Sequence, residues 1–147
     1  MEFLRGRKFR VVANGSMSRE EDVISGVPQG TVLAAILFVI MISDIDEDVK
    51  LSIIRCFADD TRVNKKIKTN EDKELMQKDL DAVYRWAEKN KMKFNEKKFE
   101  QMAHGPLKDV TVEPYKTSSG EDIEIKETVR DLGILATNDL LFKGRVK

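Results

Sequence analysis

The sequence has few of the residue types that mark disulfide-rich, zinc-binding or membrane-spanning proteins. Its one cysteine, Cys56, excludes an internal disulfide framework, fits a reducing compartment and is predicted to lie in the core. Its one histidine, His104, has no second histidine or cysteine at ligand spacing, which argues against a zinc site. The longest apolar run, 32–42, is shorter than the roughly 18 to 20 residues of a membrane span, and predicts a buried helix.

The N-terminus is basic but lacks the apolar stretch of a secretory signal. We therefore expect an intracellular protein, in the cytoplasm or nucleus, that is neither secreted nor bound to a membrane. The sequence leaves the oligomeric state open.

Net charge is also absent, because 26 basic residues balance 26 acidic ones. The distribution is uneven, however. Segment 62–68 is basic without an acid, and basic residues outnumber acidic ones in 85–98. Such runs occur on solvated faces more often than in nucleic-acid footprints, so charge alone favours the first explanation and leaves the second open.

Periodicity and turn signals predict an α+β fold, with a mixed or antiparallel sheet covered by two helices. The first helix follows a glycine-rich loop, and the second begins at an N-cap Asn70 and runs through Lys91. The other expected elements are an early hairpin over 8–25, a strand at 51–58 with a return strand at 63–67, short strands at 92–95 and 99–105, and a hairpin over 122–136.

Two adjacent carboxylates, Asp59 and Asp60, stand between an apolar run and a basic one. On a strand, neighbouring side chains point to opposite faces, whereas a turn frees both to approach one ligand. A bound divalent cation would offset their mutual repulsion, and oxygen ligands suit Mg²⁺. An exposed acidic turn without a ligand is the alternative.

Four blocks of the sequence, in this order, resemble the reverse transcriptase palm of non-LTR, LINE-type or jockey-like retrotransposons. The likeness covers residues 5 to 138, nearly the whole chain. The blocks read "SGVPQGTVLAAILFVIMISDI", "FADDT", "LDAVYRWAEKNKMKFNEKKFEQM" and "VRDLGI".

The resemblance implies RNA-templated DNA synthesis in the intact domain, with an RNA template, a DNA primer and deoxynucleotides as partners. It assigns Asp59 and Asp60 to catalysis and to the binding of two Mg²⁺ or Mn²⁺ ions. Such ions stabilise both the attacking primer hydroxyl and the leaving pyrophosphate. The loop block implies that Gln29 and its neighbours lie against the templating base and the incoming nucleotide. The residues assigned to this loop are Gly26, Pro28, Gln29 and Gly30.

In the third block the family has an asparagine followed three residues later by a lysine, here Asn95 and Lys98. The resemblance makes Lys98 the candidate general acid, with a solvent-exposed lysine as the alternative. Phe99 stands where the family usually has threonine. The last block resembles the hairpin that grips the primer, with Leu132 and Gly133 as the matched residues. Aromatic residues of the second helix, such as Trp86, are expected to pack in the core rather than stack on bases.

The family's third essential carboxylate lies in an upstream block that nothing in this sequence resembles. The chain 1–147 is therefore predicted to be a partial reverse transcriptase domain, a palm without the upstream aspartate block, most of the fingers and the thumb. Two functions remain open. One is a polymerase fragment that is inactive alone, and the other is a non-catalytic relic that keeps the fold to bind nucleic acid or a protein.

Overall fold

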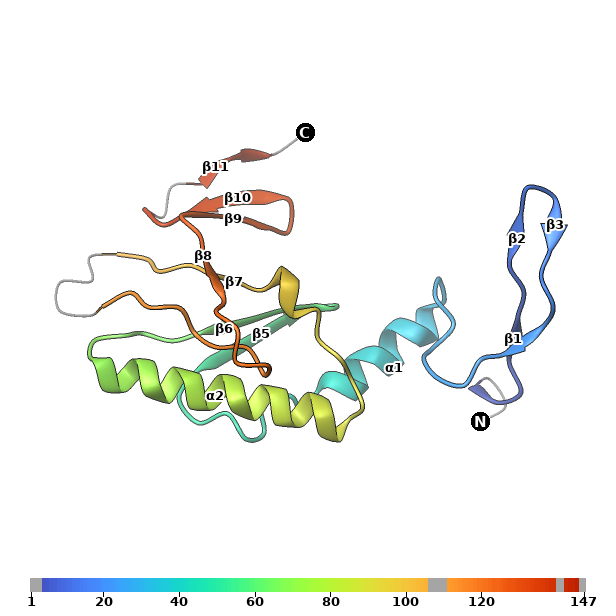
Figure 1. Cartoon of the computed structure of the whole chain (residues 1–147), viewed down its shortest axis with the longest axis horizontal. Coiled ribbons are helices and arrows are strands. Elements are labelled where there is room, and N and C mark those ends of the chain that lie inside the picture. The colour runs from blue at the N-terminus through green and yellow to red at the C-terminus, as the bar shows by residue number, and fades with distance from the viewer. Residues whose placement is uncertain (1–3, 106–110, 140–141, 146–147) are drawn as a thin grey trace. The chain divides into compact units, whose positions relative to one another are not determined.

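The computed structural model describes residues 4–105, 111–139 and 142–145. The chain divides into two compact units, Met1–Asp44 and Ile45–Lys147, and each is described by itself below. Figure 1 labels both helices and each strand except β4.

The N-terminal unit begins with a long hairpin of four short strands. Its tip is a two-residue turn, in which Asn14 and Gly15 both have positive φ, 49° and 77°. Two positive φ values are typical of a type I′ turn, whose twist matches that of paired strands. The predicted early hairpin is thereby confirmed. Its strands pair as β1 (Lys8–Phe9) with β4 (Glu21–Asp22), and β2 (Val12–Ala13) with β3 (Ser16–Met17), all antiparallel.

Helix α1 (Val32–Ile42) begins at Thr31, whose side-chain oxygen accepts a hydrogen bond from the backbone N–H of Ala34. The helix forms where the sequence predicts it, but its burial was predicted wrongly. Only Ala34 and Ile42 are buried, and Val32, for example, is 81% exposed. An all-round apolar helix needs apolar surface on every side, and the short exposed strands of its own unit do not provide it.

The C-terminal unit carries one long helix and several small sheets rather than the single mixed sheet that the sequence predicts. Its class is α+β, as expected. Among the residues of this unit that the structure describes, only β7 and β8 pair in parallel, and the other strand pairs are antiparallel. The sheets are β5 (Ile53–Phe57) with β6 (Asp60–Asn64), β7 (Glu100–Gln101) with β8 (Glu124–Ile125), and β9 (Thr128–Asp131) with β10 (Ile134–Thr137) and β11 (Phe142–Arg145).

Helix α2 (Asn70–Lys89) forms the main apolar face of this unit. Its N-cap is Thr69 rather than the predicted Asn70, because Thr69 and Asp72 complete a reciprocal capping box. The pKa of Asp72 is lowered, chiefly by the hydrogen bond from the backbone N–H of Lys68 and next by the one from the backbone N–H of Thr69. One stripe of the helix is buried, as its spacing predicts. This stripe consists of Met76, Asp79, Ala82, Val83, Trp86 and Ala87.

A buried carboxylate joins α2 to the beginning of β5. Asp79 is 4% exposed and accepts hydrogen bonds from the backbone N–H groups of Lys50 (3.0 Å) and Leu51 (3.1 Å). One turn earlier on the helix, the sulfur of Met76 accepts a hydrogen bond from the Ser52 hydroxyl at 3.2 Å. The chain entering β5 is therefore fixed to the helix by three hydrogen bonds from successive residues.

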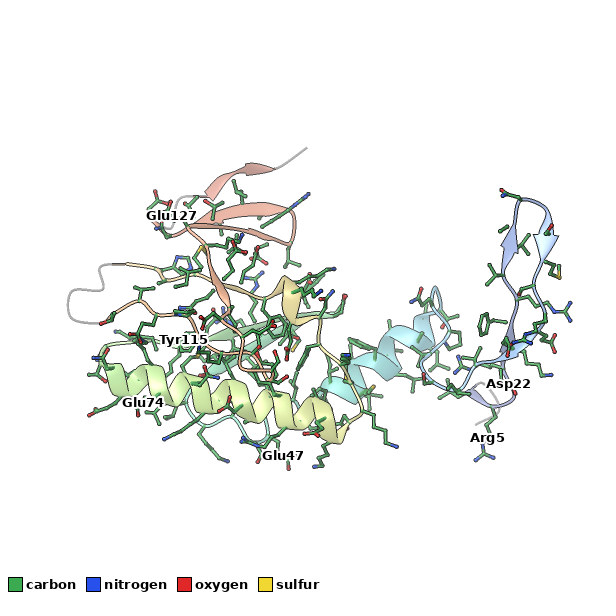
Figure 2. The ribbon with its side chains drawn as sticks, viewed as in Figure 1. Arg5, Asp22, Glu47, Glu74, Tyr115 and Glu127 are labelled. Atoms are coloured by element: carbon green, nitrogen blue, oxygen red, sulfur yellow. The ribbon has the colours of Figure 1, made fainter. Side chains whose placement is uncertain are left out.

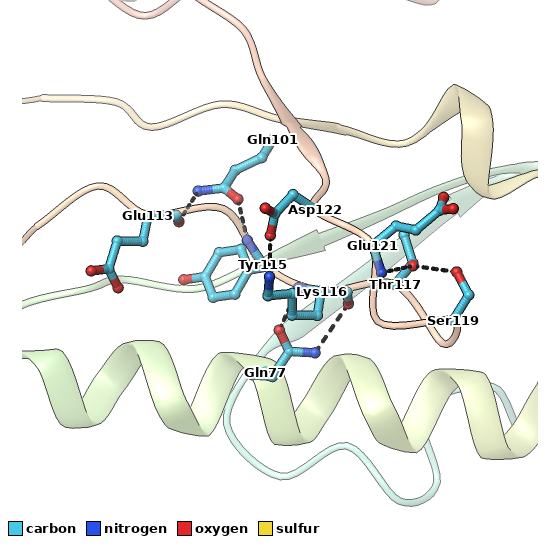
Figure 3. Close-up of polar contacts among 9 residues, drawn as sticks. All are labelled: Gln77, Gln101, Glu113, Tyr115, Lys116, Thr117, Ser119, Glu121 and Asp122. Atoms are coloured by element: carbon cyan, nitrogen blue, oxygen red, sulfur yellow. Dashed lines mark hydrogen bonds and ion pairs between the residues drawn. The ribbon is translucent and has the colours of Figure 1, made fainter.

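Two glutamine side chains hold the segment 113–117 between α2 and β7 (Figure 3). Gln77 accepts from the backbone N–H of Lys116 at 2.8 Å and donates to the Lys116 carbonyl at 3.1 Å. Gln101 accepts from the N–H of Tyr115 at 2.8 Å and donates to the Glu113 carbonyl at 3.1 Å. Each amide thus satisfies backbone groups of a segment that belongs to no strand.

The structure also differs from the sequence prediction in two short segments, 92–95 and 99–105, which were predicted to be strands. The first is not a strand, and it leads into a 3₁₀ turn at Glu96–Lys98. Only Glu100–Gln101 of the second is a strand. The hairpin predicted over 122–136 is present only from Thr128 onward, as β9 and β10, whereas Glu124–Ile125 pairs with β7 instead. Residues 106–110 lie outside the described part of the chain.

Candidate active site

Asp59 and Asp60 lie at the tip of the β5–β6 hairpin. The register pairs Phe57 with Asp60, so Ala58 and Asp59 form a two-residue turn. Ala58 has a φ of 52°, and Asp59 is not among the residues of positive φ. A positive φ at the first central residue alone is typical of a type II′ turn, which favours glycine there.

The turn is shorter than the sequence predicts, because Asp60 already belongs to β6. The prediction that a turn frees both carboxylates is therefore correct for Asp59 and wrong for Asp60. Both residues are exposed. The alternation along β6 places Asp60 on the same face as Arg62, and Asp59 stands at the end of the hairpin.

The left-handed backbone at Ala58 predicts an effect of substitution at the site. Ala58→Gly is expected to raise the free energy of unfolding by about 0.5–1 kcal/mol, since glycine removes the strain of a positive φ but gives the unfolded chain more freedom. Ala103→Gly, at a residue of ordinary φ, is the control and is expected to lower it. Urea unfolding measures both variants, and a loss of stability in Ala58→Gly would contradict the prediction.

The predicted template loop lies in the N-terminal unit, between β4 and α1. Gly26 and Gly30 both have a φ of 80°, a conformation that glycine adopts without strain. Arg7 donates a hydrogen bond to the Gly26 carbonyl at 2.6 Å, and the Thr31 hydroxyl donates to the Pro28 carbonyl at 3.1 Å. The loop is thus held at both ends, while Gln29 between them is exposed.

Lys98 is exposed at the end of the 3₁₀ turn, and Glu96 at its beginning fixes this turn to the segment 117–119. Glu96 accepts hydrogen bonds from the backbone N–H of Ser118 at 3.2 Å and from the hydroxyl of Ser119 at 3.1 Å. The Ser118 hydroxyl also bonds to it, and this is the first cause of the lowered pKa of Glu96.

An aromatic cluster holds the same turn against α2. The rings of Tyr84, Phe94 and Phe99 have their centroids 5.9–6.2 Å apart in each pair, within the range of favourable ring contacts. Burial, followed by the charges of Glu96 and Asp81, raises the pKa of Tyr84 to about 12. Phe99, where the resemblance predicts threonine, therefore has a packing role, and the prediction that the aromatic residues of this helix pack is confirmed.

Leu132 and Gly133 form the two-residue turn between β9 and β10, with φ values of 46° and 82°. They thus have the type I′ geometry that favours tight hairpins. An ion pair between Arg62 on β6 and Asp131 on β9 joins this hairpin to that of Asp59 and Asp60. The structure therefore brings together two of the predicted site segments, which are about seventy residues apart in sequence.

Sequence reasoning missed Asp131 and Glu96. Asp131 binds Arg62 of the β5–β6 hairpin, and Glu96 binds the segment 117–119. Both partner contacts are nonlocal, so no spacing rule predicts them. One signal in the sequence did point to Asp131, because it stands directly before the predicted residues Leu132 and Gly133 and therefore lies at the same end of the hairpin. Cys56 was predicted to be buried and is instead exposed, with its sulfur 3.6 Å from the Thr61 hydroxyl.

Comparison with known proteins defines the class. Residues 2–134 match the family "Reverse transcriptase (RNA-dependent DNA polymerase)". The chain belongs to this reverse transcriptase family, which confirms the resemblance seen in the sequence. No solved structure matches it significantly.

Three curated relatives come from mobile elements of fruit flies. The "RNA-directed DNA polymerase from mobile element jockey" of Drosophila funebris is 28% identical over 98% of this chain and 16% of that protein. Its Drosophila melanogaster counterpart is 35% identical over 65% of this chain and 11% of that protein. The "Probable RNA-directed DNA polymerase from transposon X-element" of Drosophila melanogaster is 40% identical over 42% of this chain and 7% of that protein. The chain thus spans about a sixth or less of the length of these relatives.

No helix in 4–105, 111–139 and 142–145 is both long and apolar enough to cross a membrane. In the same residues, no three side chains among histidine, cysteine, aspartate and glutamate gather as a metal site would require. Asp22, a carboxylate close in sequence to the template loop, lies on β4 (Figure 2).

Proposed function

We propose that this chain supplies part of the palm of a retrotransposon RNA-directed DNA polymerase, as a partial domain over 1–147. The observation that carries the proposal is the pair of exposed carboxylates at the tip of β5–β6, joined by Arg62–Asp131 to the Leu132–Gly133 hairpin. The family match supports it, since reverse transcriptases act on an RNA template and nucleotides and use divalent metal ions. The comparisons favour this function over a non-catalytic relic.

The residues of this chain take the following parts in the proposed reaction. Asp59 and Asp60 offer exposed oxygen ligands, the kind that Mg²⁺ and Mn²⁺ prefer, together with water and phosphate oxygens. When bound, the ions supply stabilisation of the charge that develops on the transferred phosphoryl group. Lys98 donates a proton to the leaving phosphate or neutralises its charge.

The two remaining segments orient the substrates. The loop of Gly26, Pro28, Gln29 and Gly30 lies against the templating base and the incoming nucleotide, where a backbone without Cβ atoms permits a close approach. The Leu132–Gly133 turn contacts the primer strand. Catalysis of phosphoryl transfer depends mostly on such positioning and on electrostatics.

A test on the chain itself concerns metal binding. The double variant Asp59→Asn, Asp60→Asn is expected to lose Mn²⁺ binding, measured as the line broadening of nearby amide signals in an NMR titration. Its free energy of unfolding should be equal or higher, because the like-charge repulsion is gone. The matched control is Asp46→Asn, Asp48→Asn, which removes the same charge from exposed residues outside the hairpin. Unchanged broadening in the Asp59, Asp60 variant would overturn the metal site.

A second test concerns polymerisation. Primer extension on an RNA template with Mg²⁺ or Mn²⁺ is measured for this chain and for a version extended upstream by the missing aspartate block and the fingers. We expect extension by the longer version only, and its loss with Asp59→Ala. Extension by the short chain would show that another acid completes the site, while activity of the longer Asp59→Ala variant would remove Asp59 from catalysis.

A further inference from the structure

Two arginines lie on the same face of the β5–β6 hairpin as Asp60, one of the candidate metal ligands. Arg62 follows Asp60 by two residues on β6, and the register places Arg55 directly opposite Arg62. Alternate residues of a strand are roughly 7 Å apart, a distance that a long arginine side chain spans. Either guanidinium, if it paired with the Asp60 carboxylate, would occupy the oxygens that a cation needs.

In the structure, neither arginine pairs with Asp60. Within the part of the chain that the structure describes, Asp60 and Arg55 take part in no ion pair. Arg62 pairs instead with Asp131, which ends β9 directly before the Leu132–Gly133 turn. The Asp131 side chain is only 30% exposed, so water screens this pair less than a pair on an open surface. The Asp60 carboxylate is thereby left without a cationic partner.

Arg62 needs a carboxylate partner because of its neighbour across the hairpin. Arg55 lies directly opposite, and like charges at opposed positions of an antiparallel pair repel each other. Three acids surround Arg62, namely Asp60 on its own strand and face, Asp59 at the end of the same hairpin, and Asp131 on β9. If Asp131 carried no charge, Asp60 would be the acid that shares a face with Arg62, and the two would attract each other.

We infer that Asp131 is a positioning residue, which holds the guanidinium of Arg62 away from Asp60 and so keeps the Asp60 carboxylate open to a divalent cation. The inference deepens the proposed function and rests on it, because it takes Asp60 as a metal ligand. It gives the Arg62–Asp131 pair a part in metal binding, in addition to joining the two hairpins. A pair that only joined the hairpins would be lost equally whichever of its two partners were replaced.

The first test measures the Mn²⁺ affinity of the chain and its variants from the electron paramagnetic resonance signal of the free ion. Asp131→Asn should lower the affinity about tenfold, because the released arginine competes with the ion for Asp60 and repels it. Arg62→Gln should not lower the affinity. The double variant Arg62→Gln, Asp131→Asn should bind Mn²⁺ within about twofold of the unmodified chain, since no arginine is then released.

The matched control is the double variant Arg55→Gln, Asp131→Asn. It has the same net charge as the first double variant and loses an arginine from the same face. It should recover little of the lost affinity, because Arg62 still binds Asp60. Equal recovery in the two double variants would overturn the inference, since the overall charge of the face would then explain the result. Equal losses in Asp131→Asn and Arg62→Gln would also overturn it, because the pair would then only join the hairpins.

A second readout, urea unfolding in EDTA, needs no metal ion. In the unmodified chain, Asp60→Asn should leave the urea midpoint unchanged or higher, because it breaks no ion pair and removes repulsion from Asp59. In the Asp131→Asn background the same substitution should lower the midpoint, because it breaks the new pair of Asp60 with Arg62. An equal effect in both backgrounds would overturn the inference. Absence of Mn²⁺ binding by the unmodified chain would instead overturn the proposed function, while the urea comparison would still judge Asp131.

Discussion

Replacing Asp79 with alanine is expected to lower the free energy of unfolding of the C-terminal unit by about 2–4 kcal/mol. The variant leaves the backbone N–H groups of Lys50 and Leu51 without their acceptor, and each buried unsatisfied donor costs about 1–3 kcal/mol. The same change frees the chain that enters β5, so amide hydrogen exchange in Ile53–Phe57 should accelerate as well. Urea unfolding followed by circular dichroism measures the loss.

The stabilisation by Asp79 should depend on pH. Burial raises the pKa of Asp79, but the hydrogen bonds from Lys50, Ser52 and Leu51 outweigh it and hold the pKa below its ordinary value of 3.8. A carboxyl whose pKa is lower in the folded state stabilises the fold above its unfolded pKa. That stabilisation disappears as the pH falls through the folded value.

We therefore expect the stability difference between the unmodified chain and Asp79→Ala to be largest near pH 7 and to shrink as the pH falls below 3.8. Asp79→Asn is the matched control. Its amide keeps one acceptor oxygen and does not titrate in this range, so it should lose less stability, without the pH dependence of the carboxylate. A difference that stays constant from pH 7 to pH 3 would contradict the assignment.

Truncation of Trp86 to alanine should be at least as costly, about 3–5 kcal/mol. Trp86 is 6% exposed in the buried stripe of α2, beside Val83 and Ala87, so the variant loses the transfer free energy of a large ring and leaves a cavity. Unfolding should be followed by circular dichroism, because the variant has no tryptophan fluorescence.

Trp86→Phe keeps most of the apolar ring and serves as the control, with an expected loss of about 1–2 kcal/mol. Folded Trp86→Ala should bind nucleic acid as the unmodified chain does, because a buried ring does not stack on bases. A loss of stability below 1 kcal/mol, together with a large loss of nucleic-acid affinity, would reverse the conclusion that Trp86 packs.

Local features of the fold could be predicted from the sequence. The Asn14–Gly15 turn has a dipeptide that favours two positive φ values, and α2 has its apolar residues at helical spacing. The N-cap was misplaced by one residue, since Thr69 and Asn70 are both good caps and only Thr69 stands three residues before Asp72. The turn at Ala58 was misplaced because alanine gives no signal of a positive φ.

Nonlocal features could not be predicted in the same way. The burial of α1 depends on apolar surface contributed by other segments, whereas its formation depends on its own residues. Gln77 and Gln101 resemble ordinary surface residues in sequence, and only the fold shows that each binds a backbone segment. At the site, the family resemblance located Asp59, Asp60 and the Leu132–Gly133 turn, but not the ion pair that joins their hairpins.

The exposure of Cys56 has a practical consequence for experiments in solution. It is the single cysteine of the sequence, and it lies on β5 three residues before Asp59. A maleimide dye or nitroxide will therefore attach at one position, without any prior mutagenesis, and report on the hairpin. Under oxidising conditions the same thiol will link two chains into a covalent dimer, which a reductant reverses.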